Sequence, residues 1–324
     1  MKRIHALRLA TLLGFMNALA CSSSLQPAAS GGSSGGAGQA AGGTTGSSGG
    51  AGQAAGGAAG AKSPAVGFAS VGAGSHFACG VRTDGTLACW GSNDLGESTP
   101  PAGTFTSVGA GDYFACAVRT DGTLSCWGSN GLGESTPPAG SFTSVSLGSH
   151  FACGVRTDGT LACWGSNDLG ESTPPVGTFA SLATGDYFAC GVKTDGTLAC
   201  WGSDGLGEST PPAGTFLSVG ACSYSACGVK TGGTVTCWGG SSLGQPTTGG
   251  ALVSLSLGQN FACGVKTDRT IACWGDNTLG QTAAPSGTFV SVSAGDYFAC
   301  GAKTDGTINC WGDDGLGQTA PPAP

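Results

Sequence analysis

Sixteen cysteines are the most prominent residues of this sequence that could do chemistry. Fourteen of them form seven pairs whose members are ten positions apart, with a Thr-Asp-Gly or closely related tripeptide between them. Paired thiols of this kind can form disulfides, bind metal ions or act as redox centres. The seven pairs are Cys79 with Cys89, Cys116 with Cys126, Cys153 with Cys163, Cys190 with Cys200, Cys227 with Cys237, Cys263 with Cys273, and Cys300 with Cys310.

The spacing of these pairs favours disulfides. Zinc ligands usually come in short spacings such as Cys-x₂-Cys, and none occurs here. If Thr83, Asp84 and Gly85 form a three-residue hairpin turn with the glycine in the left-handed region, Cys79 faces Cys89 on the neighbouring strand. Facing residues of this kind come close to disulfide distance. We therefore expect one disulfide in each pair, with free thiols and metal ligation as the alternatives.

Histidines and carboxylates are the other candidates for chemistry. Of the three histidines, His76 and His150 occupy the same repeat position, which a duplication explains better than a shared site. Carboxylates can act as acids and bases or bind calcium. However, identical residues of a repeat lie around a ring, whereas a catalytic site needs different residues at one point. We therefore expect the carboxylates to be structural or superficial, and we expect no catalytic, cofactor-binding or metal-binding residues. The equivalent positions are Asp112, Asp186 and Asp296 in one column, and Glu97, Glu134, Glu171, Glu208, Gln245, Gln281 and Gln318 in another.

These residues recur because the chain is built from a repeat. The first cysteines of successive pairs are 37 residues apart, with one step of 36. In each repeat, stretches such as "FTSV", "YFACAVR" and "TLSCW" have the composition of short strands and are separated by turn residues. Three or four short strands in every repeat of this length are typical of propeller blades. The sequence predicts an all-β fold, a seven-bladed β-propeller of 37-residue repeats with a disulfide within each blade.

The repeat resembles that of the regulator-of-chromosome-condensation family. The resemblance is carried by Asp84-Gly85-Thr86-Leu87, Trp90-Gly91, Asn93, Gly96 and the column of Gly74, and it covers residues 64–322. The repeat is similar to the short bacterial form found in type II beta-lactamase-inhibitory proteins. This resemblance implies a seven-bladed propeller. It does not carry over a target, because function resides in sites that differ between proteins of one fold.

The first residues are typical of a secretion signal. A positive start is followed by a short apolar stretch at residues 9–16 and by "ALAC" at residues 18–21. Cys21, followed by three serines, resembles the lipidated cysteine of a bacterial lipoprotein, and ordinary signal cleavage is the alternative. We expect an exported protein: a cell-envelope lipoprotein at the outer membrane or surface, or otherwise a secreted one.

Composition divides the chain into three segments. Residues 1–20 are the predicted signal peptide, and residues 21–63 are a lipidated cysteine and a flexible tether rich in Gly, Ala and Ser. Residues 64–324 are the predicted propeller. Without the signal, nine basic residues face nineteen acidic ones, which argues against nucleic acid or an anionic lipid surface as a partner.

Binding specificity is expected where the repeats differ from one another. Cys222 stands in repeat 5 where the others have glycine, and Ser225 where they have phenylalanine. Arg269 stands in repeat 6 at the left-handed turn position. Decay of the repeat is the alternative explanation. If Cys21 is lipidated, Cys222 is left over and could be reactive or form a bridge elsewhere. The candidate patch comprises Cys222, Ser223, Tyr224, Ser225, Gln259, Asn260 and Arg269.

The sequence thus predicts a non-catalytic protein-binding or scaffold module at the bacterial cell surface. We expect a monomeric head, an unknown protein or cell-surface ligand as partner, and contact with the membrane only through the lipid. The alternatives are an inhibitor of a secreted or periplasmic enzyme, a propeller-hosted hydrolase or lyase, and a purely structural coat.

Overall fold

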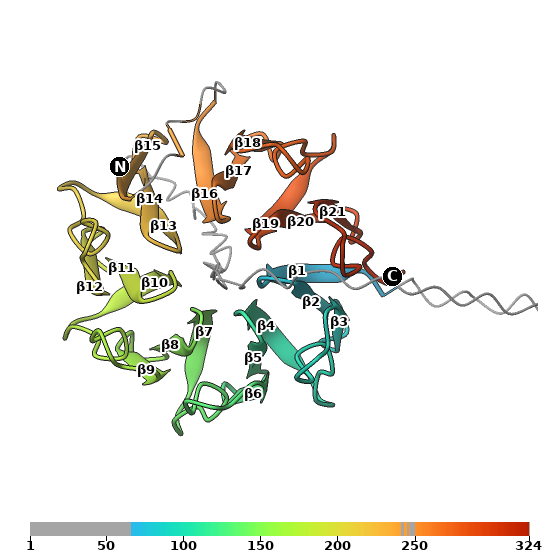
Figure 1. Ribbon diagram of the computed structural model, residues 1–324, viewed down its shortest axis with the longest axis horizontal. Coiled ribbons are helices and arrows are strands. Elements are labelled where there is room, and N and C mark those ends of the chain that lie inside the picture. The colour runs from blue at the N-terminus through green and yellow to red at the C-terminus, as the bar shows by residue number, and fades with distance from the viewer. Residues whose placement is uncertain (1–65, 241–242, 245, 247–249, 324) are drawn as a thin grey trace, which may run out of the picture. The chain divides into compact units, whose positions relative to one another are not determined.

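A computed structural model describes residues 66–240, 243–244, 246 and 250–323. All regular elements in this part of the chain are strands, and they form seven three-stranded antiparallel sheets, one for each repeat. Figure 1 shows the sheets as blades around a ring. The predicted seven-bladed propeller is confirmed. Among these residues no helix could span a lipid bilayer. The predicted signal peptide, Cys21 and the tether lie outside the described residues.

Each blade has an inner, a middle and an outer strand in chain order. The inner strands are β1 (Phe68–Ala73), β4 (Phe105–Ala110), β7 (Phe142–Leu147), β10 (Phe179–Thr184), β13 (Phe216–Cys222), β16 (Leu252–Leu257) and β19 (Phe289–Ala294). The middle strands are β2 (Phe77–Arg82), β5 (Phe114–Arg119), β8 (Phe151–Arg156), β11 (Phe188–Lys193), β14 (Ser225–Lys230), β17 (Phe261–Lys266) and β20 (Phe298–Lys303). The outer strands are β3 (Leu87–Gly91), β6 (Leu124–Gly128), β9 (Leu161–Gly165), β12 (Leu198–Gly202), β15 (Val235–Gly239), β18 (Ile271–Gly275) and β21 (Ile308–Gly312).

The turn between the middle and outer strands sets the register of the cysteines. Gly85 has a φ of 86°, and its N–H donates to the carbonyl of Arg82 at 2.8 Å. The Asp84 carboxylate accepts from the hydroxyl and the N–H of Thr86, and these two hydrogen bonds hold the pKa of Asp84 below its usual value. Beyond the turn, Cys79 pairs with Cys89 across the two strands.

All seven predicted disulfides are present. The bonded cysteines face each other across the middle and outer strands of every blade, with Cα–Cα distances of 4.0–4.1 Å. The prediction from the three-residue turn is therefore confirmed in each repeat. The bonds join Cys79 to Cys89, Cys116 to Cys126, Cys153 to Cys163, Cys190 to Cys200, Cys227 to Cys237, Cys263 to Cys273, and Cys300 to Cys310.

The two cysteines of each bond differ in burial, which the pairing of strands did not predict. The first cysteine is fully buried in the apolar layer between its blade and the next; Cys79, for example, belongs to the same cluster as Phe105 and Val108 of blade 2. The second cysteine is half-buried and packs against the same cluster as its partner, so the disulfides form part of the core that joins the blades. These half-buried cysteines are Cys89, Cys126, Cys163, Cys200, Cys237, Cys273 and Cys310.

The ring closes between the first and last blades. The N–H of Phe68 donates to the carbonyl of Gly306 at 2.6 Å, and the N–H of Ala73 donates to Ser293 Oγ at 2.8 Å. Farther out, Trp90 Nε1 donates to the carbonyl of Gln318 at 2.9 Å. Blade 7 therefore packs on blade 1 through the contacts that join successive blades elsewhere.

The ring has two chemically different faces. The face that we name the turn face carries the three-residue turns between middle and outer strands, such as 83–85. The opposite one, the loop face, carries the short connections between inner and middle strands, such as 74–76, and the loops that follow the outer strands, such as 92–99. The N–H of Ser92 donates to the carbonyl of His76 at 3.0 Å, which places both kinds of connection together.

Candidate functional site

The loops of the loop face are held by buried side chains. Glu97 accepts hydrogen bonds from the Ser92 hydroxyl at 2.6 Å and from the N–H of Leu95 at 2.8 Å. In blade 6, Asp276 and Gln281 replace the serine and the glutamate. Gln281 donates from Nε2 to Asp276 at 2.9 Å and accepts from the N–H of Leu279. Donor and acceptor change places together, so the loop keeps its conformation. The described members of the Glu97 column thus hold their loops, and Gln245 lies outside the described residues.

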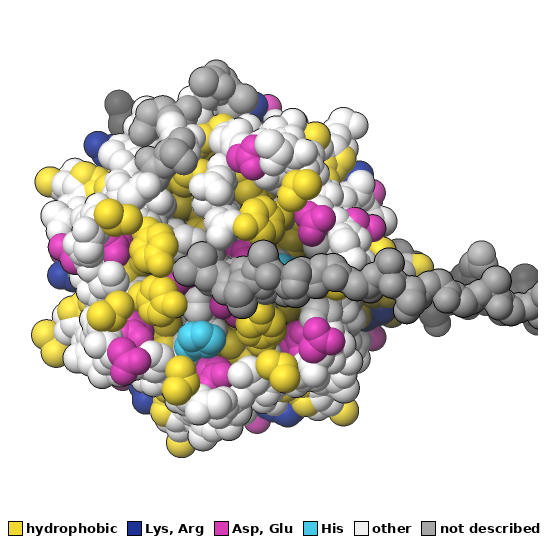
Figure 2. Space-filling view, in the orientation of Figure 1, with side chains coloured by type: hydrophobic (Ala, Val, Ile, Leu, Met, Phe, Trp, Pro, Cys, Tyr) yellow, Lys and Arg dark blue, Asp and Glu magenta, His cyan; other side chains and the backbone are white. Residues whose placement is uncertain are grey.

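These rigid loops expose apolar side chains. In six of the seven blades one leucine of the loop is about half exposed, for example Leu132 at 56%. In blade 5 the equivalent Leu243 is buried, and Gly240 contacts Leu206. The other exposed members of this column are Leu95, Leu169, Leu206, Leu279 and Leu316. Figure 2 shows hydrophobic side chains spread over this face.

At the axis, the loop face carries a ring of small and acidic residues that we name the axial ring. Its members follow the inner strands and are, in blade order, Ser75, Asp112, Ser149, Asp186, Ser223, Gln259 and Asp296. Six of them are at most 8% exposed. The ring is tight because a glycine precedes it in six blades. A Cβ on Gly111 would lie 2.7 Å from the carbonyl oxygen of Gly148 in the next blade.

The three carboxylates of the axial ring influence one another. Burial, followed by the charges of Asp112 and Asp186, raises the pKa of Asp296 well above its usual value. Ser75 Oγ donates to Asp112, and its hydrogen bond with Asp296 opposes the rise in that pKa. Sequence reasoning assigned this column to structure or surface, and the hydrogen bond between Ser75 and Asp112 fits a structural role. It did not predict that the blades carry these carboxylates to one end of the axis, close enough to interact electrostatically.

An aromatic collar surrounds the axial ring. The next residue in each blade is, in order, His76, Tyr113, His150, Tyr187, Tyr224, Asn260 and Tyr297. The rings of Tyr187 and Tyr224 are stacked, with centroids 6.5 Å apart and planes at 29°. Burial and the neighbouring charge of Asp186 raise the pKa of Tyr187. A histidine and several hydrophobic side chains are visible near the middle of this face in Figure 2.

Positive charge is confined to the turn face among the described residues. Every described lysine and arginine lies at the end of a middle strand or, for Arg269, in the turn that follows it. Six of the nineteen acidic residues cap turns on that face, and the other thirteen belong to the loop face. The rim of Figure 2 carries the Lys and Arg side chains, and the face itself shows Asp and Glu. The described cations are Arg82, Arg119, Arg156, Lys193, Lys230, Lys266, Arg269 and Lys303.

The structure divides the candidate patch of blades 5 and 6. Ser223, Tyr224, Gln259 and Asn260 lie in the axial ring and the collar, next to Cys222 and Ser225. Arg269 lies at the other end of its blade, on the turn face, with a φ of 67° as its position predicts. The strand β17 separates it from Asn260.

Cys222 and Ser225 are matched to each other. They pair at the end of a seven-residue β13, and Ser223 closes the hairpin with a φ of 44°. In the other blades a phenylalanine packs over the glycine column, and a Cβ on Gly111 would lie 2.7 Å from the Phe114 ring. Blade 5 has a small residue where the others have Phe, which leaves room for the cysteine. Cys222 is buried and disulfide-bonded, so it is not a free thiol.

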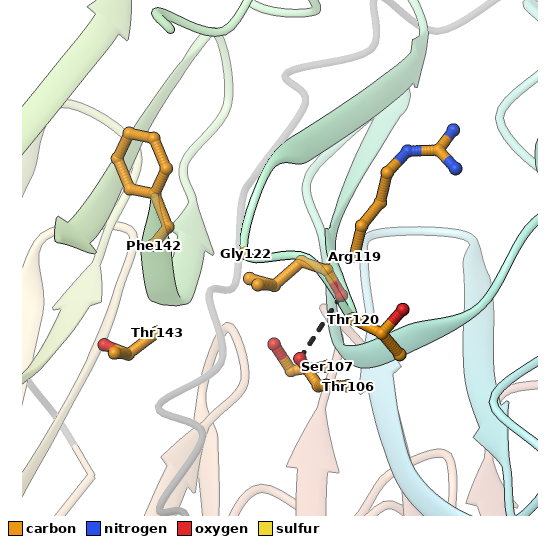
Figure 3. A pocket seen from close by; sticks show the side chains of 8 residues that line it. Thr106, Ser107, Arg119, Thr120, Gly122, Phe142 and Thr143 are labelled. Carbon is orange, nitrogen blue, oxygen red and sulfur yellow. Dashed lines mark hydrogen bonds between the residues drawn. The ribbon is translucent and has the colours of Figure 1, made fainter. Parts of the chain in front are cut away.

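A cavity of about 220 Å³ lies between blades 2 and 3, nearer the turn face. Figure 3 shows Thr106, whose Oγ1 donates to the carbonyl of Val118 at 3.3 Å, and Arg119, whose guanidinium points away from the other labelled side chains. Ser107 Oγ is buried there without a hydrogen-bond partner, as are the equivalent Ser70, Ser218 and Ser291. The unpartnered serine hydroxyl therefore recurs in several blades and is not special to this cavity. Its lining residues are Thr106, Ser107, Val118, Arg119, Thr120, Gly122, Phe142 and Thr143.

Comparisons with known proteins agree with this fold. A sequence model described as "Regulator of chromosome condensation (RCC1) repeat" matches residues 68–97, 105–134, 142–171, 179–208, 252–281 and 289–318. Repeat 5 is absent from these matches. No curated protein matches the chain significantly.

Solved structures provide further likenesses. The CRINKLY WD40 ectodomain of the Arabidopsis thaliana receptor kinase ACR4 is 28% identical, with a TM-score of 0.66, over 80% of this chain and 98% of that one. The ectodomain of the Physcomitrella patens receptor kinase CR4 is also 28% identical, with a TM-score of 0.66, over 76% and 74% of the two chains. Prp20p of Saccharomyces cerevisiae is 13% identical, with a TM-score of 0.60 over 72% and 81%, which shows the fold alone.

Proposed function

The chain belongs to the regulator of chromosome condensation (RCC1) repeat family, and on that basis we propose that it is an exported, non-catalytic propeller that binds a protein through its loop face. The observation that carries this proposal is the loop face itself. It combines half-exposed leucines and an aromatic collar on rigid loops, and the described part of the face has no lysine or arginine. Exposed apolar side chains gathered on one face are typical of protein-binding surfaces.

Export is supported by two observations. Seven disulfides need an oxidising compartment to form and persist. The structures that match at 28% identity are described as receptor-kinase ectodomains. With the predicted signal at residues 1–20, these support an exported head. A lipid on Cys21 as its anchor at the cell envelope is a separate part of this proposal, and it competes with the disulfide of Cys222 for the remaining cysteine.

The anchor is tested by the intact mass of the protein from its native envelope, measured with and without reduction. An acyl mass on Cys21 supports the anchor. Cys222 is disulfide-bonded, and Cys21 is the one cysteine of the chain outside the seven pairs and Cys222. A lipid attached through a thioether to the sulfur of Cys21 would prevent that sulfur from forming a disulfide with Cys222. A lipid-free mass that increases on reduction by two hydrogen atoms for each of eight disulfides, rather than for seven, would overturn the anchor.

Protein binding is tested with variants of the full chain that differ in only one face. Leu132→Asp with Leu169→Asp places two charges on the loop face, where both side chains are half exposed. Val176→Asp is the matched control, because this side chain is 96% exposed and the carbonyl of the equivalent Ala139 accepts from Arg156 of the turn face. We expect saturable binding to a protein of the producer's envelope or secretome, lost in the double variant and kept in the control. Equal binding by all three proteins would contradict the proposal.

A further inference from the structure

Apolar side chains on the turn face are gathered in blades 5–7. The second residue of each inner strand lies at this face, because the first bonds to a turn, as the N–H of Phe289 does to the carbonyl of Arg269 at 2.8 Å. In blades 5 and 7 this second residue is Leu217, which is 42% exposed, and Val290, which is 50% exposed. In blade 6 it is the half-buried Val253. One sector of the turn face is therefore apolar. The equivalent residues of the other blades are Ala69, Thr106, Thr143 and Ala180.

The same sector has a surplus of positive charge. In blades 1–4 each cation at the end of a middle strand is followed by an aspartate in the turn, as Arg82 is by Asp84. Blade 5 has Gly232 in place of that aspartate, and blade 6 has Arg269 in place of the turn glycine. Cations and carboxylates are therefore equal in number on the turn face of blades 1–4, whereas cations exceed carboxylates in blades 5–7. The charged residues of this sector are Lys230, Lys266, Arg269 and Lys303, with Asp268 and Asp305.

These two features together describe an interaction surface. Exposed apolar side chains gathered in one place are typical of surfaces that bind a macromolecule. The inner strands β13, β16 and β19, which carry the apolar residues, are neighbours in the ring (Figure 1). The surplus of cations selects a partner with an acidic surface, because complementary charge on two contacting surfaces favours their association.

The loop face of this chain has the properties that such a partner needs. Among the described residues it has no lysine or arginine. Asp94 and Asp168 are exposed on it, and each precedes a half-exposed leucine, Leu95 at 55% and Leu169 at 53%. An apolar and acidic surface therefore lies on one face of the chain, and an apolar and basic sector lies on the other. The two surfaces can meet only between different copies of the chain.

The distances between faces decide whether this attraction outweighs the net charge. The chain has nineteen acidic residues and only eight described cations, so two copies repel each other at long range. The Debye length is about 10 Å at 0.1 M salt. Contacting faces of opposite charge lie within this length, whereas faces of like charge in two stacked copies are separated by a six-residue strand, which is roughly 20 Å long. Salt therefore screens the repulsion more than the attraction.

We propose that the turn face of blades 5–7 binds the loop face of a second copy of this chain. This inference rests on the proposed function, because it uses the loop face, and it names one partner for that face. Leu217 and Val290 contact the leucines of the second copy, and the surplus cations lie near its exposed aspartates. Because the two contacting surfaces differ, the contact can be repeated into a stack. The monomeric head expected from the sequence is then the dissociated state.

Sedimentation velocity of the full chain between about 1 µM and 1 mM tests the association. We expect the sedimentation coefficient to rise with concentration. Leu217→Asp with Val290→Asp, the turn-face variant, should weaken association at least about tenfold. Ala69→Asp with Ala180→Asp is the matched control, because both residues are exposed at the same repeat position and the added charge is the same. Equal association of the two variants, or an unaltered chain that is monomeric throughout, would overturn the proposal.

A mixture tests whether unlike faces meet. Leu132→Asp with Leu169→Asp, the loop-face variant, should also lose association, because both side chains are half exposed on that face. This variant keeps its turn face, and the turn-face variant keeps its loop face. An equimolar mixture should therefore form pairs and nothing longer. A mixture that stays monomeric would overturn the contact between unlike faces, and so would a loop-face variant that still associates by itself.

Asp94→Lys with Asp168→Lys tests the charge of the contact. The exchange makes the chain less negative, which by itself would favour association. We expect association at least about tenfold weaker, and weaker association of the unaltered chain when salt rises from about 0.1 M to 0.5 M. Asp204 and Asp314 are kept because each accepts a hydrogen bond from its own loop at 2.9 Å. Equal or stronger association of the variant would contradict charge complementarity.

The inference and the proposed function fail in different ways. If the chain is monomeric but Leu132→Asp with Leu169→Asp abolishes binding of a different protein, the loop face remains the interface and self-association is overturned. If the mixture forms pairs but no other protein of the envelope or secretome binds, the contact between copies remains and the proposed binding of a separate protein is overturned.

Discussion

Blades 1–4 and the junction of blades 5 and 6 differ in how each blade is attached to the one before it. In blades 1–4, the tryptophan after the second cysteine donates through Nε1 to a carbonyl of the preceding blade, as Trp164 does to Glu134 at 2.8 Å. In blade 6, Trp274 Nε1 is buried without a hydrogen-bond partner. Blade 5 also lacks the serine that bonds the loop glutamate, because Gly240 occupies its position.

The difference shows that one substitution in a repeat can be compensated by a second substitution at a contacting position. Cys222 and Ser225 replace a glycine and a phenylalanine that pack on each other elsewhere, and they pair across one hairpin. This coupled exchange preserves the ring. Trp274, in contrast, has lost a partner without a visible replacement among the described residues. The junction therefore contains one compensated change and one uncompensated change.

The largest expected effect contrasts Phe151 with its counterpart in blade 5. Phe151 is fully buried over the glycine column, so Phe151→Ala should lower the free energy of unfolding by about 3–5 kcal/mol. Ser225→Ala should change it by less than about 1 kcal/mol, because a small side chain already fills that place. Denaturant unfolding of both variants, with the disulfides intact, measures the difference. Equal losses would mean that blade 5 is not repacked around the smaller residue.

A smaller effect is expected at the tryptophans. Trp164→Phe removes the hydrogen bond to Glu134 and leaves that carbonyl without its partner, which should cost about 1–2 kcal/mol. Trp274→Phe loses a similar apolar volume but removes a donor that has no partner, so the cost should be smaller or of opposite sign. Because both variants replace tryptophan with phenylalanine, the difference between their free energies of unfolding reports the hydrogen bond and not the smaller ring. If Trp274→Phe is the more destabilising of the two, Nε1 of Trp274 donates a hydrogen bond and the junction is not uncompensated.

The turn of blade 6 should respond to a glycine. Arg269 has a φ of 67°, where the equivalent residues of the other blades are glycines. Arg269→Gly should raise the free energy of unfolding by about 0.5–1 kcal/mol, because the left-handed conformation is strained for a residue with a Cβ. Gly196→Ala is the reverse control in blade 4 and should lower it by a similar amount, because Gly196 has a φ of 84° and a Cβ there would lie no closer than 3.4 Å to its nearest neighbour, Thr215. A loss of stability in Arg269→Gly would show that the side chain makes a contribution larger than the strain.

The smallest effect is expected at the axial ring, where Asp296→Asn exchanges two side chains of nearly the same shape. The pKa of Asp296 is raised by burial and by Asp112 and Asp186, while Ser75 opposes the rise. His76 of blade 1 and Tyr297 lie in the adjoining collar. A carboxyl with a raised folded pKa favours the folded state below its unfolded pKa, and this contribution is lost as pH rises through the folded value.

Asp296→Asn should therefore raise the midpoint of thermal unfolding at pH 7, and the gain should disappear toward pH 4. The turn-face variant Asp305→Asn is its control, because hydrogen bonds from Thr307 lower the pKa of Asp305. That variant should lose stability at pH 7 and not at low pH. A gain for Asp296→Asn that persists unchanged in acid would contradict the electrostatic explanation.

Much of the blade could be predicted from local sequence. The Thr-Asp-Gly turn fixes the register, and the register places Cys79 opposite Cys89. A lysine or arginine also precedes each turn, so the sequence contains the information for the separation of charge between the two faces. Predicting that separation requires knowing that all seven turns lie on one face of the ring. The grouping of Arg269 with Asn260 did not allow for the six-residue strand between them.

The sequence by itself determined the strands, turns, disulfide pairs and number of blades, since each depends on residues within one repeat. Only the tertiary structure decided which columns meet. Closure of the ring through Phe68 and Gly306 brings Asp112, Asp186 and Asp296 from three blades to one end of the axis. The physical reason is that a column's distance from the axis depends on how the blades pack, through the close approach at the glycine column, and no single repeat contains that information.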